Sequence, residues 1–95
     1  MSLYTVYSKN DGCVFCERAI DMLEQNNKAF VTIKCTDVAD MKDILRTTWA
    51  LPEDVIQNIR TFPQILHDGN LVGGYFELYN IIRNEANTFS TDAEF

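Results

Sequence analysis

The pattern of apolar and polar residues predicts a strand, a helix and a second strand in the first third of the chain. Residues 3–7 are β-branched and aromatic, and the turn-forming residues 8–12 follow, which indicates a strand and a loop. Residues 29–35 form a second strand-like run. Between these two strands, a helix is expected to end at Asn26-Asn27. Its apolar positions recur at helical spacing, at Phe15, Ala19, Met22 and Leu23.

The rest of the chain predicts two helices, a hairpin and a closing helix. Asp37 is expected to cap a helix with apolar positions at Met41, Ile44, Leu45 and Thr48. A shorter helix is expected over residues 52–59. Asp68-Gly69 is the strongest hairpin signal and joins the predicted strands 63–67 and 70–74. A last helix with Leu78, Ile81 and Ile82 is expected to end near Ala86, and the polar, acidic residues 87–95 are expected to fray.

This order of elements predicts an α/β fold. The helix between the first two strands makes those strands parallel, whereas the hairpin makes the last two antiparallel. A mixed four-stranded sheet flanked by helices follows, in the order βαβαββα. The chain has 95 residues, of which 46% are hydrophobic, which suits one domain over residues 1–95 with a core of its own.

Charge and cysteine usage narrow the range of partners. Eight Lys and Arg face fourteen Asp and Glu, and the net charge of −6 disfavours binding to nucleic acid. The sequence holds no apolar run of membrane-spanning length and no secretory signal, so no membrane partner is expected. The three cysteines are an odd number, which favours a reducing compartment over a secreted disulfide framework. We therefore expect a cytoplasmic protein.

The motif Cys13-Val14-Phe15-Cys16 lies where the first loop becomes the first helix. Residues three apart on a helix are neighbours, with roughly 5 to 6 Å between their β-carbons, so the two sulfurs can form and break a disulfide. Free backbone N–H groups at the first turn would lower the pKa of Cys13 and make it the nucleophile. Cys16 lies deeper in the helix and would act as the resolving thiol.

Two alternatives for this cysteine pair stay open. A zinc site would need two more ligands, and only Cys35, at a strand end, and His67, beside the hairpin turn, are available. No second closely spaced ligand pair accompanies them, so redox chemistry is favoured over a metal. The other alternative is that Cys13 and Cys16 are incidental buried cysteines.

Two further motifs follow the cysteine pair. In Thr61-Phe62-Pro63 a proline begins a strand, where it costs no ladder hydrogen bond, and a cis bond would present the Phe62 backbone to an extended peptide. The residues alone favour the commoner trans bond. Gly73-Gly74 permits close backbone approach ahead of a helix start, although a simple tight turn also explains the pair.

Taken in order, these three motifs resemble those of the glutaredoxins. The resemblance extends from Leu3 to about Ala86 and implies a thioredoxin-like fold with glutathione-linked dithiol chemistry. It makes Cys13 the nucleophile and Cys16 the resolving thiol, and it implies glutathione as co-substrate without a metal. Phe15 matches the aromatic residue between the cysteines, and Pro63 matches the cis-proline of the family.

The resemblance also implies a glutathione site. Thr61 and Phe62 match the segment that pairs with the backbone of glutathione. Gly74, Phe76 and Glu77 match the residues that receive the γ-glutamyl end, and Lys9 is expected to meet a carboxylate. The chain departs from the family at four places, because Val14 replaces a proline, Phe76 a small polar residue, Glu77 an aspartate and Asn10 a basic residue.

The expected function is therefore that of a monomeric thiol–disulfide oxidoreductase that reduces glutathione mixed disulfides and protein disulfides. Ribonucleotide reductase is among the protein partners considered. In one alternative, a thioredoxin-reductase-type flavoprotein recharges the dithiol in place of glutathione. In a second, Cys13 holds a glutathione-ligated iron–sulfur cluster. In a third, the fold serves as a redox-inert adaptor.

Overall fold

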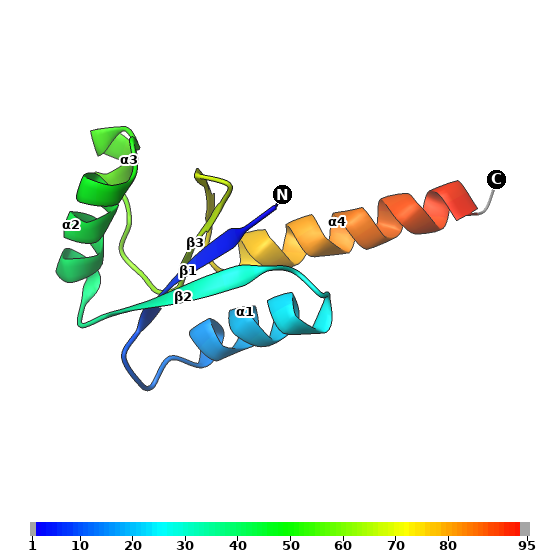
Figure 1. Cartoon of the computed structure of the whole chain (residues 1–95), viewed down its shortest axis with the longest axis horizontal. Helices are drawn as coiled ribbons and strands as arrows, with labels where there is room; N and C mark the ends of the chain where they lie inside the picture. The colour runs from blue at the N-terminus through cyan, green and yellow to red at the C-terminus, as the bar shows by residue number, and fades with distance from the viewer. Residues whose placement is uncertain (1, 94–95) are drawn as a thin grey trace.

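A four-stranded mixed sheet forms the centre of the molecule (Figure 1). The structure is a computed structural model that describes residues 2–93, with side chains up to residue 85. The strands are β1 (Tyr4–Lys9), β2 (Phe30–Cys35), β3 (Gln64–His67) and β4 (Asn70–Gly73), in the spatial order β2-β1-β3-β4. Strand β1 pairs parallel with β2 and antiparallel with β3, and β3 pairs antiparallel with β4. The predicted mixed sheet is therefore confirmed.

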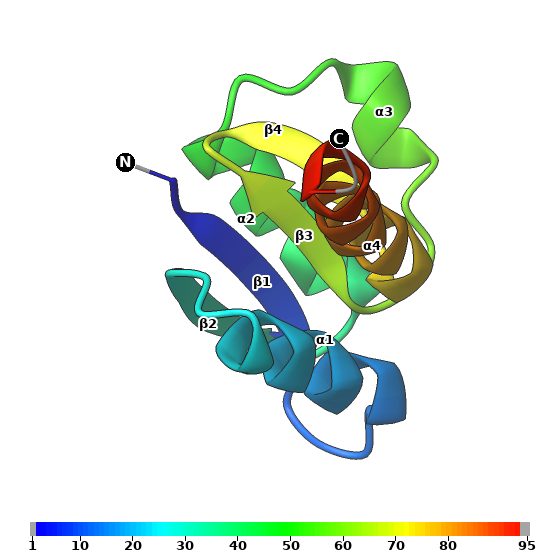
Figure 2. The ribbon, with the colours of Figure 1, turned by 90° about the vertical axis from the view of Figure 1, so that its right-hand side faces the viewer.

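Helices cover both faces of the sheet (Figure 2). They are α1 (Val14–Gln25), α2 (Val38–Thr48), α3 (Glu53–Gln57) and α4 (Tyr75–Ala93). Helices α1 and α4 lie against one face, and α2 lies behind the other. None of the helices in the described part of the chain is both long and apolar enough to span a bilayer.

Two apolar clusters, one on each side of the sheet, hold these layers together. Along β1, Tyr4 and Val6 point to the side of α1 and α4, whereas Tyr7 points to α2. This alternation follows from the two-residue period of a strand and leaves β1 buried on both faces. The α1–α4 cluster contains Tyr4, Val6, Ala19, Leu23, Ile65, Leu78 and Ile82. The α2 cluster contains Tyr7, Cys35, Met41, Leu45, Ile59 and Leu66.

Helix α4 is longer than the sequence pattern predicted. The predicted end was near Ala86, but the helix continues to Ala93 and projects beyond the sheet in Figure 1. Residues 87–93 contain neither proline nor glycine, so nothing interrupts the helical hydrogen bonds after the last core position. Residues 94 and 95 lie outside the described residues, and fraying of residues 87–95 stays a prediction.

Strand pairing brings the three sequence motifs to one end of the sheet. The parallel pairing ends at Lys9 and Cys35, just before the loop to Cys13. Because β3 runs antiparallel to β1, Gln64 lies opposite Tyr7, and the Pro63 motif is at the same end. The last residue of β4, Gly73, pairs with Ile65 and leads directly into α4.

Candidate active site

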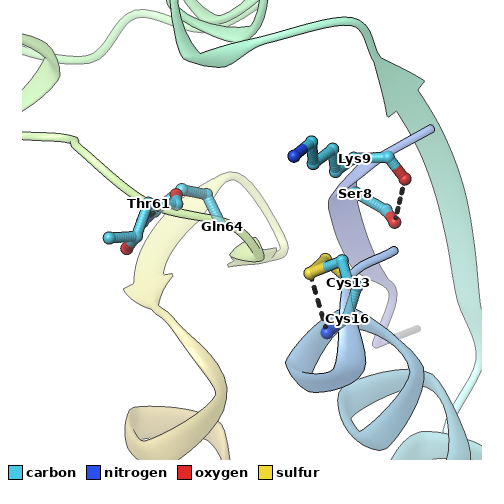
Figure 3. Close-up of a disulfide and its surroundings, with 6 residues drawn as sticks. All are labelled: Ser8, Lys9, Cys13, Cys16, Thr61 and Gln64. Carbon is cyan, nitrogen blue, oxygen red and sulfur yellow. Dashed lines mark hydrogen bonds between the residues drawn. A yellow bond between two sulfur atoms is a disulfide. The ribbon is translucent and has the colours of Figure 1, made fainter. Parts of the chain in front are cut away.

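The sulfur of Cys13 caps helix α1. Cys13 has extended backbone angles as the N-cap residue, and the Cys16 N–H donates to Cys13 Sγ at 3.2 Å (Figure 3). The two cysteines form a disulfide, with their α-carbons 5.2 Å apart. Helix-start N–H groups stabilise negative charge, so the same amide would stabilise a Cys13 thiolate once the disulfide is reduced.

The two sulfurs differ in exposure. Cys13 is half-buried, whereas Cys16 is 2% exposed and faces the core side of α1. The exposed sulfur is the one that a bulky disulfide substrate can reach, and the buried one can attack only a partner already attached to Cys13. This geometry fits the predicted roles of nucleophile and resolving thiol.

A cavity of about 260 Å³ lies beside the β1–α1 loop, and both Cys13 and Cys16 are among its lining residues. Two charged residues that precede Cys13, Lys9 and Asp11, both line it. Lys34 also lines it, and the sequence analysis missed this residue. The register of the parallel strands β1 and β2 could have indicated Lys34, because Lys34 pairs with Ser8 near the end of β1. The surroundings of Cys13 therefore combine charges of both signs.

The loop that carries Cys13 is fixed at both ends. The Asn10 N–H donates to the Cys35 backbone oxygen at 3.1 Å, which ties the start of the loop to β2. Gly12 has a φ of +66°, in the left-handed region that favours glycine, immediately before Cys13. In Figure 3 the Lys9 side chain extends from β1 toward the segment with Thr61 and Gln64.

A second cavity, of about 240 Å³, gathers the residues expected to contact glutathione. Its lining residues are Phe15, Thr61, Phe62, Pro63, Gly74, Tyr75, Phe76 and Glu77. All the contact residues that the resemblance implied are therefore brought together, except Lys9, which lines the first cavity. Tyr75 is the additional member, and the sequence analysis missed it. Its position at the first turn of α4, next to Gly74, is the signal that could have found it.

The Phe62–Pro63 peptide bond is cis. The residues alone favoured trans, and this preference was wrong, whereas the family resemblance implied the cis bond correctly. The general statistics of X-Pro bonds contain nothing about the surrounding fold, so they cannot identify the exception. The Gln64 side-chain N–H donates to the Thr61 backbone oxygen at 3.1 Å across this turn.

Glu77 is partly engaged in its own helix. The Gly74 N–H donates to Glu77 Oε1 at 2.7 Å, so the carboxylate caps the start of α4. A β-carbon at Gly73 would lie 3.0 Å from Glu77 Oε1, and Gly73 has a φ of +120°. The glycine pair therefore makes room for this carboxylate. The second oxygen of Glu77 keeps its capacity to accept a ligand hydrogen bond.

Aromatic rings form one wall of the second cavity. The ring centroids of Phe15 and Phe76 are 5.4 Å apart, and Tyr75 lies 5.8 Å from Phe15 and 5.2 Å from Phe76. Phe76 is 60% exposed and Phe15 is 40% exposed, which is unusual for such large apolar side chains. Exposed apolar groups concentrated in one place indicate a binding surface.

Comparison with known proteins identifies the family. The glutaredoxin family model matches residues 4–72, a stretch that includes the cysteine pair and Pro63. The chain belongs to the glutaredoxin family. Glutaredoxins are thiol–disulfide oxidoreductases, and the Cys13–Cys16 pair fits their redox centre. None of the curated protein sequences matches the chain.

Solved glutaredoxin structures resemble the chain over most of its length. Glutaredoxin 1 from Francisella tularensis, determined with cacodylate, is 28% identical with a TM-score of 0.67, covering 92% of this chain and 99% of that one. Reduced Escherichia coli glutaredoxin is 20% identical with a TM-score of 0.58, covering 90% of this chain and 98% of that one. The second likeness is evidence for the fold alone. Together they confirm the predicted thioredoxin-like α/β fold.

The remaining candidates lie outside the redox centre of this glutaredoxin. Cys35 is buried at the end of β2, and burial, assisted by the Asp40 carboxylate, raises the pKa of its thiol. His67 stacks on Tyr4, with ring centroids 4.1 Å apart, at the opposite end of the sheet.

The zinc alternative does not fit this arrangement. Cys35 lies beside the last residue of β1, and His67 lies beside the first. About 17 Å of strand separates these two positions, too far for both side chains to bind one ion with the Cys13–Cys16 pair. Among the residues that the structure describes, no three His, Cys, Asp or Glu side chains are grouped to hold a metal.

Proposed function

We propose that the protein uses glutathione to reduce glutathione mixed disulfides and protein disulfides. The observation that carries this proposal is the cavity beside the cysteine pair. It joins Thr61 and Phe62 to Gly74 and Glu77, which come from segments far apart in the chain. These are the positions at which the family resemblance implies contacts with the backbone and the γ-glutamyl end of glutathione.

In the monothiol reaction, the Cys13 thiolate attacks the glutathione sulfur of a mixed disulfide R–S–S–G. A Cys13–glutathione disulfide forms, the substrate S–S bond breaks, and R–S⁻ leaves and takes a proton from solvent. A second glutathione thiolate then attacks this glutathione sulfur. It releases oxidised glutathione and restores the Cys13 thiolate. Each mixed disulfide thus consumes one free glutathione, and the other half of the oxidised glutathione comes from the substrate.

In the dithiol reaction, the first product is a mixed disulfide between Cys13 and a protein. Cys16 loses its proton to solvent and attacks Cys13 Sγ, which releases the reduced protein and forms the Cys13–Cys16 disulfide. The oxidised pair in this structure corresponds to that product. Two glutathione molecules then restore both thiols by successive exchange.

The residues around the sulfurs take separate parts in this scheme. The Cys16 amide stabilises the attacking Cys13 sulfur. Glu77 and Gly74 at the start of α4 take the γ-glutamyl end, and Lys9 meets a carboxylate from the other side of the sulfur. Because Glu77 also caps α4, we expect its carboxylate to be held more rigidly than a carboxylate without this hydrogen bond.

We further propose that the protein acts as a monomer in the cytoplasm, where a reducing environment keeps its thiols available. Its partners would be protein disulfides, with ribonucleotide reductase among them. Turnover with glutathione and glutathione reductase should exceed turnover with thioredoxin reductase. The reverse order would favour the flavoprotein-recharged donor instead.

Cysteine substitutions test the proposal directly. With the mixed disulfide of glutathione and 2-mercaptoethanol, Cys13→Ser should lose at least about a thousandfold in kcat/KM because the nucleophile is gone. Cys16→Ser should keep this activity and lose the reduction of protein disulfides. Cys35→Ala is the matched control and should keep both activities, since Cys35 is buried away from the cavity. Turnover by Cys13→Ser would contradict the proposal.

A further inference from the structure

Ser8 is a buried polar residue in the apolar row of β1 that faces α1. Side chains alternate along a strand, so Tyr4, Val6 and Ser8 point to the same side. Tyr4 and Val6 belong to the α1–α4 cluster, and Ser8, which is 5% exposed, continues their row with a hydroxyl group. A buried polar group costs free energy unless it is hydrogen-bonded. The Ser8 hydroxyl therefore requires partners inside the fold.

The path of the chain places Ser8 level with Cys16. Strands β1 and β2 are parallel, so α1, which joins them, runs back along the sheet in the opposite direction. From Val6 to Ser8, β1 advances by about 6.6 Å, and from Ala19 back to Cys16, α1 covers about 4.5 Å in the same direction. Because Val6 and Ala19 share one cluster, Ser8 and Cys16 come next to each other. Both line the cavity of about 260 Å³, and Figure 3 shows Ser8 near the first turn of α1.

The charged side chains around this cavity are exposed to solvent. They come from β1, the following loop, α1 and β2, and they are Lys9, Asp11, Glu17 and Lys34; Asn10 adds an exposed amide. Water screens exposed charges, and two positive and two negative groups partly cancel at the Cys16 sulfur. Among the described residues that line the cavity, Ser8 is the one with a buried side-chain oxygen.

The Ser8 hydroxyl can change its hydrogen-bond partner. In the oxidised structure it donates to the Lys9 backbone oxygen at 3.0 Å, and the disulfide sulfur of Cys16 carries no charge that would compete. After reduction, a Cys16 thiolate would be a stronger acceptor, because hydrogen bonds to ionised groups are stronger than neutral ones. A hydroxyl can rotate its single proton toward a new acceptor. Lys9 is exposed, so water can then satisfy its backbone oxygen.

We propose that the Ser8 hydroxyl donates a hydrogen bond to Cys16 Sγ and stabilises the thiolate of the resolving cysteine. Ser8 transfers no proton. The Cys16 proton passes to solvent, and the thiolate then attacks Cys13 Sγ and releases the reduced protein. The hydroxyl offsets part of the cost of ionising a buried thiol. This inference rests on the proposed function, because it concerns the step in which Cys16 resolves a mixed disulfide on Cys13.

The ionisation of Cys16 tests the proposal directly. In the double variant Cys13→Ser and Cys35→Ala, Cys16 is the single thiol, and the serine at position 13 is uncharged, as Cys13 is in a mixed disulfide. NMR of the Cys16 β-carbon against pH gives the midpoint of ionisation. Adding Ser8→Ala should raise this midpoint by roughly 0.5 to 1 pH unit, the size expected for one net hydrogen bond.

Ellman's reagent measures the consequence for resolution. In a Cys35→Ala parent with one equivalent of reagent, Cys13 attacks first and releases one thionitrobenzoate. Cys16 then attacks the mixed disulfide on Cys13 and releases the second, in a phase whose rate does not depend on reagent concentration. At pH 7, Ser8→Ala should slow this second phase about twofold to threefold, because the higher nucleophilicity of a more basic sulfur offsets part of the lost thiolate.

Two further variants are matched controls. Ser8→Thr keeps a hydroxyl at the same place in β1, and the Cys16 midpoint should remain that of the parent. Thr5→Val removes a hydroxyl that is also 5% exposed, but from the opposite face of β1, and it should change neither the midpoint nor the second phase.

An unchanged Cys16 midpoint in Ser8→Ala would overturn the role of Ser8. Equal midpoint shifts in Ser8→Ala and Thr5→Val would overturn it too, because a general disturbance of β1 would then explain both. The same holds if the midpoint of Ser8→Thr matches that of Ser8→Ala. In each case the proposed function stands if the wild-type protein reduces the mercaptoethanol–glutathione disulfide. No turnover of any disulfide would overturn the proposed function, and the role of Ser8 with it.

Discussion

Two cysteines near the same end of the sheet have opposite surroundings. Cys13 is half-buried, begins a helix and accepts a hydrogen bond from the Cys16 N–H. Cys35 is 1% exposed, ends a strand, and has a pKa raised by burial and by Asp40. The Asn10 N–H donates to the Cys35 backbone oxygen, so the loop before Cys13 is hydrogen-bonded to the end of the strand that carries Cys35. We therefore expect exposure and a helix-start amide, and not nearness to the site, to decide which thiol is reactive.

The largest expected effect is the difference in alkylation between these thiols. At pH 7 in the reduced protein, iodoacetamide should modify Cys13 at least about a hundredfold faster than Cys35, because only Cys13 combines exposure with a stabilised thiolate. Peptide mapping by mass spectrometry over time measures both rates in one sample. Comparable rates for the two residues would remove the contrast on which the mechanism depends.

A second expected effect concerns stability at alkaline pH. The folded state raises the Cys35 pKa above the unfolded value of about 8.5, so its stabilising effect is complete below that pH and is lost as the pH rises through the folded pKa. Unfolding by urea, with the Cys13–Cys16 disulfide intact, should show the free energy of unfolding falling above about pH 8.5. Cys35→Ala should cost about 1 kcal/mol at pH 7 and flatten this fall.

The ionisation of Tyr4 and Tyr7 sets the highest pH at which that experiment can be interpreted. Burial raises the pKa of both phenols above the usual value, so they also lower stability as they ionise at higher pH. The comparison of wild type with Cys35→Ala is therefore made below about pH 10. An identical pH dependence in the two proteins would show that Cys35 does not ionise unfavourably in the fold.

The smallest expected effect comes from the charges in the wall of the first cavity. Lys9→Gln should raise the Cys13 pKa and lower its alkylation rate at pH 6 by about twofold to threefold, the size expected for exposed charges. Asp11→Asn should change the rate by a similar factor in the opposite direction. The two variants are matched, because each replaces one charge with an amide in the same loop. A shift in the same direction for both would point to a change in loop structure instead.

The parts of this molecule that the sequence predicted depend on local signals. The β1–α1–β2 unit follows from apolar periodicity, and the hairpin follows from Asp68-Gly69, whose residues both have positive φ. The place of Cys13 at the start of α1 was predicted in the same way. Each of these features is decided by a few neighbouring residues.

The parts that were missed depend on pairing across the fold. Lys34 reaches the first cavity only because β2 pairs with β1 in one particular register. The place of Tyr75 among the cavity rings depends on where α4 meets α1. The cis bond at Pro63 came from the family resemblance and not from the residues themselves.

The pH dependence of Cys13 alkylation most directly tests the claim that a backbone amide makes this sulfur reactive. In the double variant Cys16→Ser and Cys35→Ala, Cys13 is the single thiol, and the amide at position 16 is retained. The rate with iodoacetamide should rise with a midpoint below about pH 7.5, inside the range of thiols at helix starts. A midpoint at about pH 8.5, that of an unperturbed cysteine, would contradict the account.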